Sequence, residues 1–105
     1  QMKQVILNIA LNAFDAMPDG GELRLITRMI KNRVAVVIKD TGKGIPSEIQ
    51  DKIFNMYFST KNTGGGIGLA ISQKIVEAHE GKIYFKSKAG AGTSFIIELP
   101  RVGEI

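Results

Sequence analysis

The stretch VAVVIKDTGKGIP, residues 34–46, decides the fold because it contains an abrupt change from strand to turn. Residues 34–39 are rich in valine and isoleucine, which favour β-strands. The DTGKG turn, residues 40–44, follows at once with residue types that interrupt regular structure. Ser47 is then suited to cap the N-terminus of a short helix, which we expect to end at Phe54.

The residues before this stretch predict a hairpin preceded by a helix. Residues 22–30 alternate apolar with polar side chains, as in a strand, and a turn over 31–33 joins them to the valine-rich strand. Residues 5–17 have a helical pattern, and the Pro-Asp-Gly-Gly turn at 18–21 stops it.

The residues after this stretch add a loop, a helix and a second hairpin. Residues 55–66 form a loop that ends in three glycines, and residues 67–79 have apolar side chains at helical spacing. Strands are expected over 82–87 and 93–99, around the small residues 89–92. Hairpins rather than βαβ crossovers dominate this order. We therefore predict an α+β, two-layer α/β sandwich with helices on one face of the sheet, and not a doubly wound parallel sheet.

Length and composition indicate one globular domain, residues 1–105. The chain has 44% hydrophobic and 23% charged residues, as is ordinary for such a domain. The absence of cysteine excludes disulfides and thiolate metal sites and fits a cytoplasmic protein. No apolar run approaches the roughly 18 residues of a membrane span, and no signal peptide is recognisable. Because Gln1 already lies in a helical pattern, we expect a piece of a longer protein, truncated at its N-terminus, whose membrane anchor could lie upstream.

The net charge of +4 would suit phosphate-rich ligands, including nucleic acid. The basic residues are scattered, however, and Lys82, Lys86 and Lys88 alternate with Ile83 and Phe85 as on the solvated face of a strand. No aromatic stacking pattern accompanies them. We therefore predict no nucleic-acid partner.

A row of polar residues follows one line of the first helix: Gln1, Gln4, Asn8, Asn12 and Asp15. Such a row can be a stripe that faces solvent. Asparagine is a mediocre helix former, however, and Lys or Glu would solvate a helix better. Two asparagines one turn apart on an otherwise apolar helix can instead face a ligand, because amide oxygens suit Mg²⁺ and its phosphate oxygens.

Two glycine-containing segments allow two interpretations each. In the DTGKG turn, Asp40 can accept a hydrogen bond from an amine while Gly42 and Gly44 leave room for a ligand, or Asp40 can simply initiate a turn. The glycines at 64–68 can free N–H groups at a helix N-terminus for an anion, or form a flexible surface loop. Neither a Walker A nor a GxGxxG pattern is present.

Together these segments resemble one family. The order Asn8-x-x-x-Asn12-Ala13, Asp40-x-Gly42-x-Gly44, Ile53-Phe54-x-x-x-Phe58, Gly66-x-Gly68-Leu69 is similar to the N, G1, F and G2 boxes of the ATP-binding catalytic domain of sensor histidine kinases. That domain has the Bergerat-type fold shared by gyrase, Hsp90 and MutL. The resemblance covers nearly the whole chain. It implies a mixed sheet of four to five strands with three helices on one face, of which four strands are apparent here.

The resemblance also implies a role for each matching residue. Asn12 corresponds to a Mg²⁺ ligand and Asn8 to its partner on the phosphate side. Asp40 corresponds to the acceptor for the adenine amino group, with Thr93 beside it through water. The remaining nucleotide-binding residues would be Gly42, Gly44, Ile45, Phe54, Phe58, Gly64, Gly66, Gly68 and Leu69, of which Phe54 and Phe58 form the hinge of the ATP lid.

The chain departs from the family pattern at Asp15, where many members have a basic residue that contacts phosphate. Lys61, in the short lid over 59–66, is the substitute candidate for this catalytic cation. His79-Glu80-Gly81 replaces a frequent His-Gly-Gly. Because His79 ends a helix, we expect it to cap carbonyl groups rather than to accept phosphate.

The resemblance implies a kinase that uses Mg-ATP to phosphorylate a histidine on a separate dimerisation domain, from which the phosphoryl group passes to an aspartate of a response regulator. The fragment would be monomeric and the parent a homodimer. Family members that hydrolyse ATP use a glutamate at the position of Asn8, and an amide cannot take a proton from water. A nucleotide sensor without catalytic activity is the third alternative, which the presence of Asn12, Asp40 and both glycine boxes disfavours.

Overall fold

The computed structural model describes residues 1–54 and 69–100, which contain three helices and four strands. In chain order these elements are α1 (Met2–Asp15), β1 (Leu23–Ile30), β2 (Arg33–Asp40), η1 (Ser47–Lys52), α2 (Leu69–Ala78), β3 (Lys82–Ser87) and β4 (Thr93–Pro100). The predicted order of elements is confirmed, and the predicted bounds of β3 match the observed ones.

The four strands form one sheet in the order β1-β2-β4-β3, and every neighbouring pair is antiparallel. The α+β prediction is therefore confirmed, but the mixed sheet is not found among the described strands. The reason is connectivity: two hairpins, β1–β2 and β3–β4, lie side by side so that β2 pairs with β4. In the first hairpin Ile30 pairs with Arg33, which leaves a turn of two residues.

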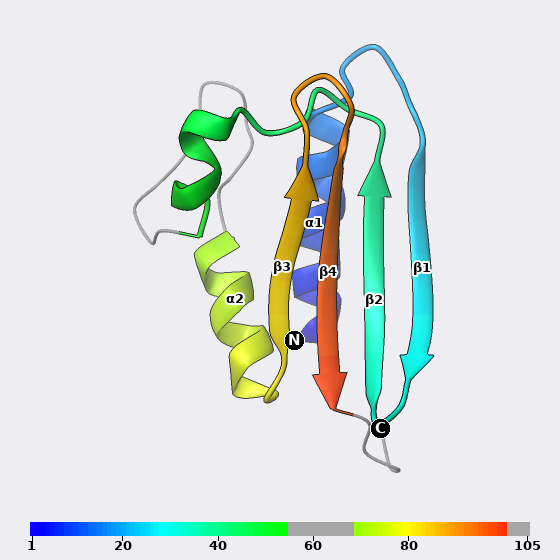
Figure 1. The fold of residues 1–105 in the computed structure, drawn as a ribbon, viewed down its shortest axis with the longest axis vertical. Coiled ribbons are helices and arrows are strands. Elements are labelled where there is room, and N and C mark those ends of the chain that lie inside the picture. The colour runs from blue at the N-terminus through cyan, green and yellow to red at the C-terminus, as the bar shows by residue number, and fades with distance from the viewer. Residues whose placement is uncertain (55–68, 101–105) are drawn as a thin grey trace.

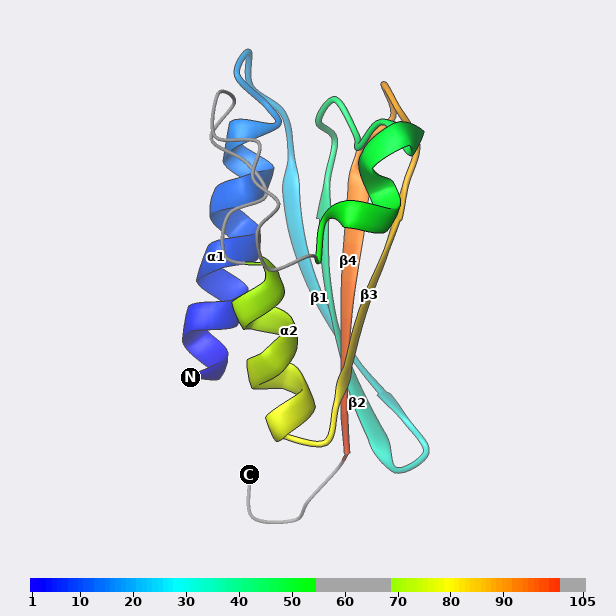
Figure 2. The same ribbon diagram turned by 90° about the vertical axis from the view of Figure 1, so that its left-hand side faces the viewer.

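The two α-helices cover one face of this sheet, as Figures 1 and 2 show. The third helix, η1, lies beside the β3 edge near the β3–β4 turn rather than over the sheet. It is a short 3₁₀ helix that begins at Ser47 and ends at Lys52, so the predicted end at Phe54 and the predicted capping role of Ser47 are wrong. Pro46 occupies the N-cap position, with φ of −57°, and supplies no side-chain hydrogen bond.

The core lies between the helix layer and the sheet. Its buried members come from every element except β1 and η1, and from Ile53, which follows η1: Val5, Ile9, Ile38, Ile53, Leu69, Val76, Ile83, Phe95 and Ile97. None of the helices within residues 1–54 and 69–100 is long and apolar enough to cross a membrane.

Two surfaces are more exposed than the sequence pattern predicts. Leu25 on β1 is 60% exposed, because β1 is the edge strand and α1 lies behind β4, away from it (Figure 1). Leu7, Leu11 and Phe14 on α1 are at least half exposed. The apolar side chains of the first helix are therefore only partly buried, which weakens the inference that its asparagines must face a ligand.

Candidate functional site

The DTGKG segment after β2 is held between the end of α1 and the β3–β4 turn. The backbone N–H of Lys43 donates to the Ala16 carbonyl at 3.0 Å, and the Gly90 N–H donates to the Lys43 carbonyl at 2.7 Å. Ala16 lies one turn after Asn12, so these bonds bring the asparagine-bearing end of α1 next to the loop. Three segments that are distant in sequence thus meet at one end of the sheet.

The glycines of this loop are required by the protein's own backbone. A Cβ on Gly42 would lie 2.5 Å from the Ala16 carbonyl oxygen, and a Cβ on Gly44 would overlap the carbonyl oxygen of Lys88. Gly44 has a φ of 75°, a conformation that favours glycine, whereas Gly42 does not have a positive φ. At the Cβ positions of both glycines the space is filled by protein, and their role toward a ligand stays a prediction.

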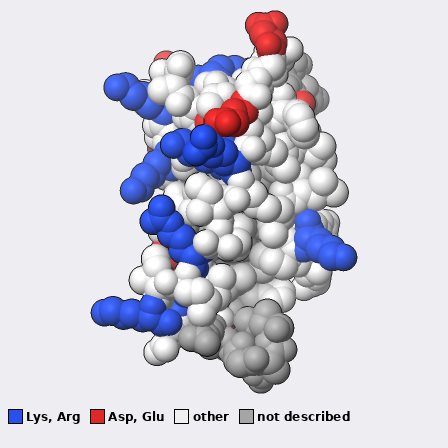
Figure 3. Space-filling model, turned by 90° about the vertical axis from the view of Figure 1, so that its right-hand side faces the viewer, with Lys and Arg blue, Asp and Glu red and all other residues white. Residues whose placement is uncertain are grey.

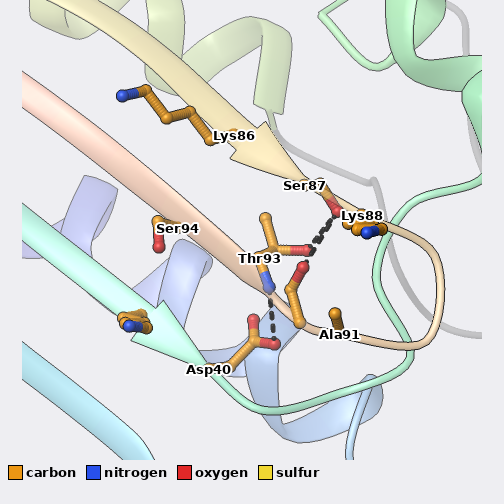
Figure 4. Close-up of a pocket in the computed structure, with 9 residues that line it drawn as sticks. Asp40, Lys86, Ser87, Lys88, Ala91, Thr93 and Ser94 are labelled. Atoms are coloured by element: carbon orange, nitrogen blue, oxygen red, sulfur yellow. Dashed lines mark hydrogen bonds between the residues drawn. The ribbon is translucent and has the colours of Figure 1, made fainter.

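Asp40 is the buried acid of the site, with 6% of its surface exposed. Its Oδ1 accepts a hydrogen bond from the backbone N–H of Gly42 at 2.8 Å. The same oxygen accepts from the backbone N–H of Thr93 at 3.2 Å (Figure 4). Within the described part of the chain, no protein donor reaches Oδ2. Oδ1 therefore makes the contact expected of an aspartate that initiates a turn. Oδ2 is available to accept a hydrogen bond from a ligand.

Ser87 at the end of β3 was missed by the sequence reasoning. Its hydroxyl accepts from the Ile45 N–H at 2.8 Å and contacts the Thr93 hydroxyl at 2.8 Å and the Gly92 carbonyl at 3.2 Å. The side chain of Gln50, donating to the Ile45 carbonyl at 2.9 Å, holds the same loop from η1. A serine at the end of an alternating strand carries no distinctive signal, because the partners that define its role come from other segments.

The asparagine row divides into two groups. Gln4 and Asp15, like Gln1, are exposed, so the solvent-facing interpretation holds for them. Asn8 and Asn12 are half-buried, and the amide nitrogen of Asn12 is buried with no hydrogen-bond partner. A buried unpaired donor is costly, so Asn12 is suited to a ligand that can accept from it.

The other predicted site residues fall in three places. Ile45 and Phe54 are half-buried against the core, and Phe54 forms an aromatic cluster with Phe85 and Phe95 at centroid distances of 6.0 and 6.5 Å. Leu69 is buried in the core at the start of α2, where its side chain serves packing. Phe58, Lys61, Gly64, Gly66 and Gly68 lie outside the described residues.

His79 lies at the C-terminal end of α2, and its Nδ1 is 2.8 Å from the Ile75 carbonyl, to which it can donate. The predicted capping contact is therefore confirmed. Among residues 1–54 and 69–100, no group of three His, Cys, Asp or Glu side chains could hold a metal ion. A metal at this site would need amide and phosphate oxygens instead.

A two-layer fold with a buried carboxylate, a half-buried asparagine pair and a glycine loop at one end defines a class of ATP-binding domain. Residues 1–103 match the family described as "Histidine kinase-, DNA gyrase B-, and HSP90-like ATPase". The chain belongs to this family, and it is a catalytic ATP-binding domain of the histidine kinase type.

Particular relatives place it within that family. The chain is 39% identical over 101 residues to sporulation kinase A of Bacillus subtilis (strain 168), covering 96% of the chain and 17% of the relative. The solved catalytic domain of histidine kinase ThkA, nucleotide-free, matches with a TM-score of 0.84 and 37% identity, covering 95% of the chain and 66% of that domain. ThkA in complex with the response regulator protein TrrA matches with a TM-score of 0.79 and 33% identity, over 97% of the chain and 29% of ThkA.

Proposed function

We propose that this chain binds Mg-ATP and presents its γ-phosphate to a histidine on a separate dimerisation domain. In the whole protein the phosphoryl group would then pass to an aspartate of a response regulator, as the ThkA–TrrA complex suggests by analogy. The chain spans less than a fifth of the length of sporulation kinase A, which leaves room for such domains in a longer protein. We place the reaction in the cytoplasm, with a homodimeric parent protein.

The observation that carries this proposal is the difference between the two carboxylate oxygens of Asp40. One oxygen is fixed by two backbone N–H groups, which orients the other without a ligand being present. A buried acceptor of fixed direction can accept a hydrogen bond from the amino group of adenine. It would face the carbonyl oxygen of guanine, which is also an acceptor, without a proton between them. Thr93 lies beside it and is held by Ser87, so both are preorganised.

The residues present fit Mg²⁺ bound to phosphate oxygens. The amide of Asn12 would contribute its oxygen to the ion and its unpaired nitrogen to a phosphate oxygen, and Asn8 would support the phosphates one turn earlier. The ion would supply neutralisation of charge on the transferring phosphoryl group. We assign to Lys61 the role of the cation that contacts phosphate beside Mg²⁺. Asp15 cannot take this role, because its side chain is exposed and negatively charged.

Catalysis on this proposal is mainly positioning. Asn8 has an amide that cannot accept a proton from water, which favours transfer to a histidine over hydrolysis. A passive nucleotide sensor would share the binding residues but would show no phosphotransfer when the histidine domain is added.

Calorimetric titration of the chain with ATP and with GTP tests the proposal. We expect ATP to bind at least about tenfold more tightly, because facing acceptors with no proton between them cost about 1–3 kcal/mol. Asp40→Asn should weaken ATP binding by a similar factor while keeping the Oδ1 acceptor. Asp19→Asn, in an exposed turn, is the matched control. Equal affinities for the two nucleotides would refute the role of Asp40.

A further inference from the structure

The sheet face opposite the helices is strongly basic. Alternation along the strands places Ile38, Ile83 and Ile97 in the core and directs their neighbours outward. The outward-facing charged residues of the four strands are Arg24, Arg28, Arg33, Lys39, Lys82, Lys86 and one acid, Glu98. In Figure 3, Lys and Arg side chains project along the left side of the view with few acidic groups between them.

The few acids near this face are paired with arginines. Arg24 pairs with Glu22 at 3.2 Å, and Arg33 pairs with Glu98 at 3.3 Å. No other ion pair occurs within residues 1–54 and 69–100. Lys39 and Lys86 are thus left with no acidic partner in that part of the chain, so their charges are uncompensated by direct contact.

Lys39 and Lys86 flank a serine across three adjacent strands. Ser94 on β4 pairs with Lys39 on β2 and with Lys86 on β3, so the three side chains form one row on the outer face. Figure 4 labels two members of this row, Ser94 and Lys86. The row borders a cavity of about 260 Å³ at the end of the sheet, which Lys88 and Ala91 of the β3–β4 turn also line.

We propose that this cavity is a second anion site that binds a soluble compound carrying phosphate groups. The ammonium groups of Lys39 and Lys86 and the hydroxyl of Ser94 can all donate, and phosphate offers several acceptor oxygens to such a set. The Ser94 hydroxyl has no hydrogen bond with the described protein groups, so it is available as a donor. Lys88, which also lines the cavity, provides a third cation, and this favours a ligand with more than one negative charge.

This site is separate from the proposed nucleotide site. Asp40 and Thr93 also line the cavity, but alternation directs their side chains toward the helix-covered face. The carboxylate of Asp40 already accepts two backbone hydrogen bonds on that side. The two sites therefore lie back to back across the ends of β2 and β4, and the inference does not depend on the nucleotide site.

Titration with inorganic pyrophosphate tests the proposal, with amide chemical shifts followed by NMR at constant ionic strength and without magnesium. We expect saturable shifts at Lys39, Lys86 and Ser94. The double variant Lys39→Gln/Lys86→Gln should raise the dissociation constant about tenfold or more, since each lost charge weakens attraction to the anion. Arg28→Gln/Lys82→Gln, which removes two outer-face cations away from the cavity, should change it less than about twofold.

Three results would overturn the proposal. Shifts that do not saturate, or that weaken equally in both double variants, would mean diffuse attraction to a basic surface. Shifts confined to α1 and the DTGKG loop, and lost in Asn12→Ala, would mean binding at the nucleotide site only. Unchanged binding in a Lys39→Gln/Lys86→Gln protein that gives a folded spectrum would exclude these lysines directly.

Discussion

At the scale of single residues, Asp40 and Asn12 each combine an effect on folding with a proposed role in binding. Asp40 stabilises the end of β2 through one oxygen and keeps the other available. Asn12 carries a buried nitrogen with no partner in the described chain, which costs stability until a ligand accepts from it. Such a stability cost agrees with the proposed binding role of Asn12, because functional sites are often less stable than other parts of a protein.

Asn12→Ala should separate these two effects. Without nucleotide, the free energy of unfolding should be unchanged or raised by up to about 1 kcal/mol, because an unpaired donor is removed and alanine favours the helix. The gain in ATP affinity that magnesium provides should largely disappear. Calorimetry with and without magnesium, together with thermal unfolding, measures both effects. Gln4→Ala, an exposed member of the same row, is the control. If magnesium helps both variants equally, the row only faces solvent.

Tyr84 gives the chain a pH dependence at alkaline pH. Its hydroxyl donates to Glu98 at 2.5 Å, and this bond, with burial and the negative charge of Glu98, raises the pKa of Tyr84 above its ordinary value of 10.0. A raised pKa means that the folded state holds the proton more tightly than the unfolded state. The stabilisation is therefore complete below pH 10.0 and is lost as the pH rises through the folded-state pKa.

Tyr84→Phe should lower the thermal unfolding midpoint slightly at neutral pH, since the side chain is 38% exposed and solvent weakens the bond. The difference from the wild type should shrink above pH 10.0. Unfolding curves between neutral and strongly alkaline pH measure it. A difference that grows with alkaline pH would contradict the assigned hydrogen bond.

At the scale of the element, α2 ends in a capping motif in which a non-glycine residue, Glu80, has a positive φ. Gly81 N–H donates to the Val76 carbonyl and Glu80 N–H to the Glu77 carbonyl, both at 2.9 Å, which is the bonding pattern of a Schellman motif. Glu80 occupies its left-handed position with φ of 61°, a conformation that favours glycine. A glutamate in place of glycine at this turn therefore has a stability cost.

Glu80→Gly should raise the free energy of unfolding by about 0.5–1 kcal/mol, because glycine adopts the left-handed conformation without strain. Chemical denaturation measures the change. Glu77→Gly, inside the same helix, is the matched control and should lower stability by about 1 kcal/mol. A loss of stability in Glu80→Gly would mean that the glutamate side chain contributes more than its backbone conformation costs.

At the scale of the whole molecule, the described chain contains the proposed binding residues but no histidine that is free to accept phosphate. Its single histidine caps α2, and Asn8 cannot act as a general base. We therefore expect the chain alone to remain unlabelled with γ-labelled ATP and to hydrolyse ATP only slowly. Addition of a histidine-bearing dimerisation domain as a separate polypeptide should produce labelling of that domain.

His79→Ala is the control for that experiment, and it should cause only a small loss of stability. Labelling of the chain alone that disappears in His79→Ala would show that His79 is the phosphoacceptor. The proposal that the phosphorylated histidine lies on a separate domain would then be wrong.

The sequence by itself determined the elements and the candidate residues. Strand periodicity, turn residues and helical spacing are local properties, so the order of elements and the bounds of β3 follow from them. The four boxes also identify the family without any structure, because their order and spacing are specific. The roles of all the site residues remain predictions, and the lid residues also lie outside the described part of the chain.

Only the tertiary structure decided how these elements meet. The antiparallel pairing of β2 with β4, the exposure of β1 and the contact of Ser87 with Ile45 all join segments that are distant in sequence. At Gly42 and Gly44, the carbonyl groups of Ala16 and Lys88 occupy the space that a Cβ would need, and no local pattern shows this. Local sequence patterns reflect the conformation of a segment, whereas packing depends on which other segment occupies the adjacent space.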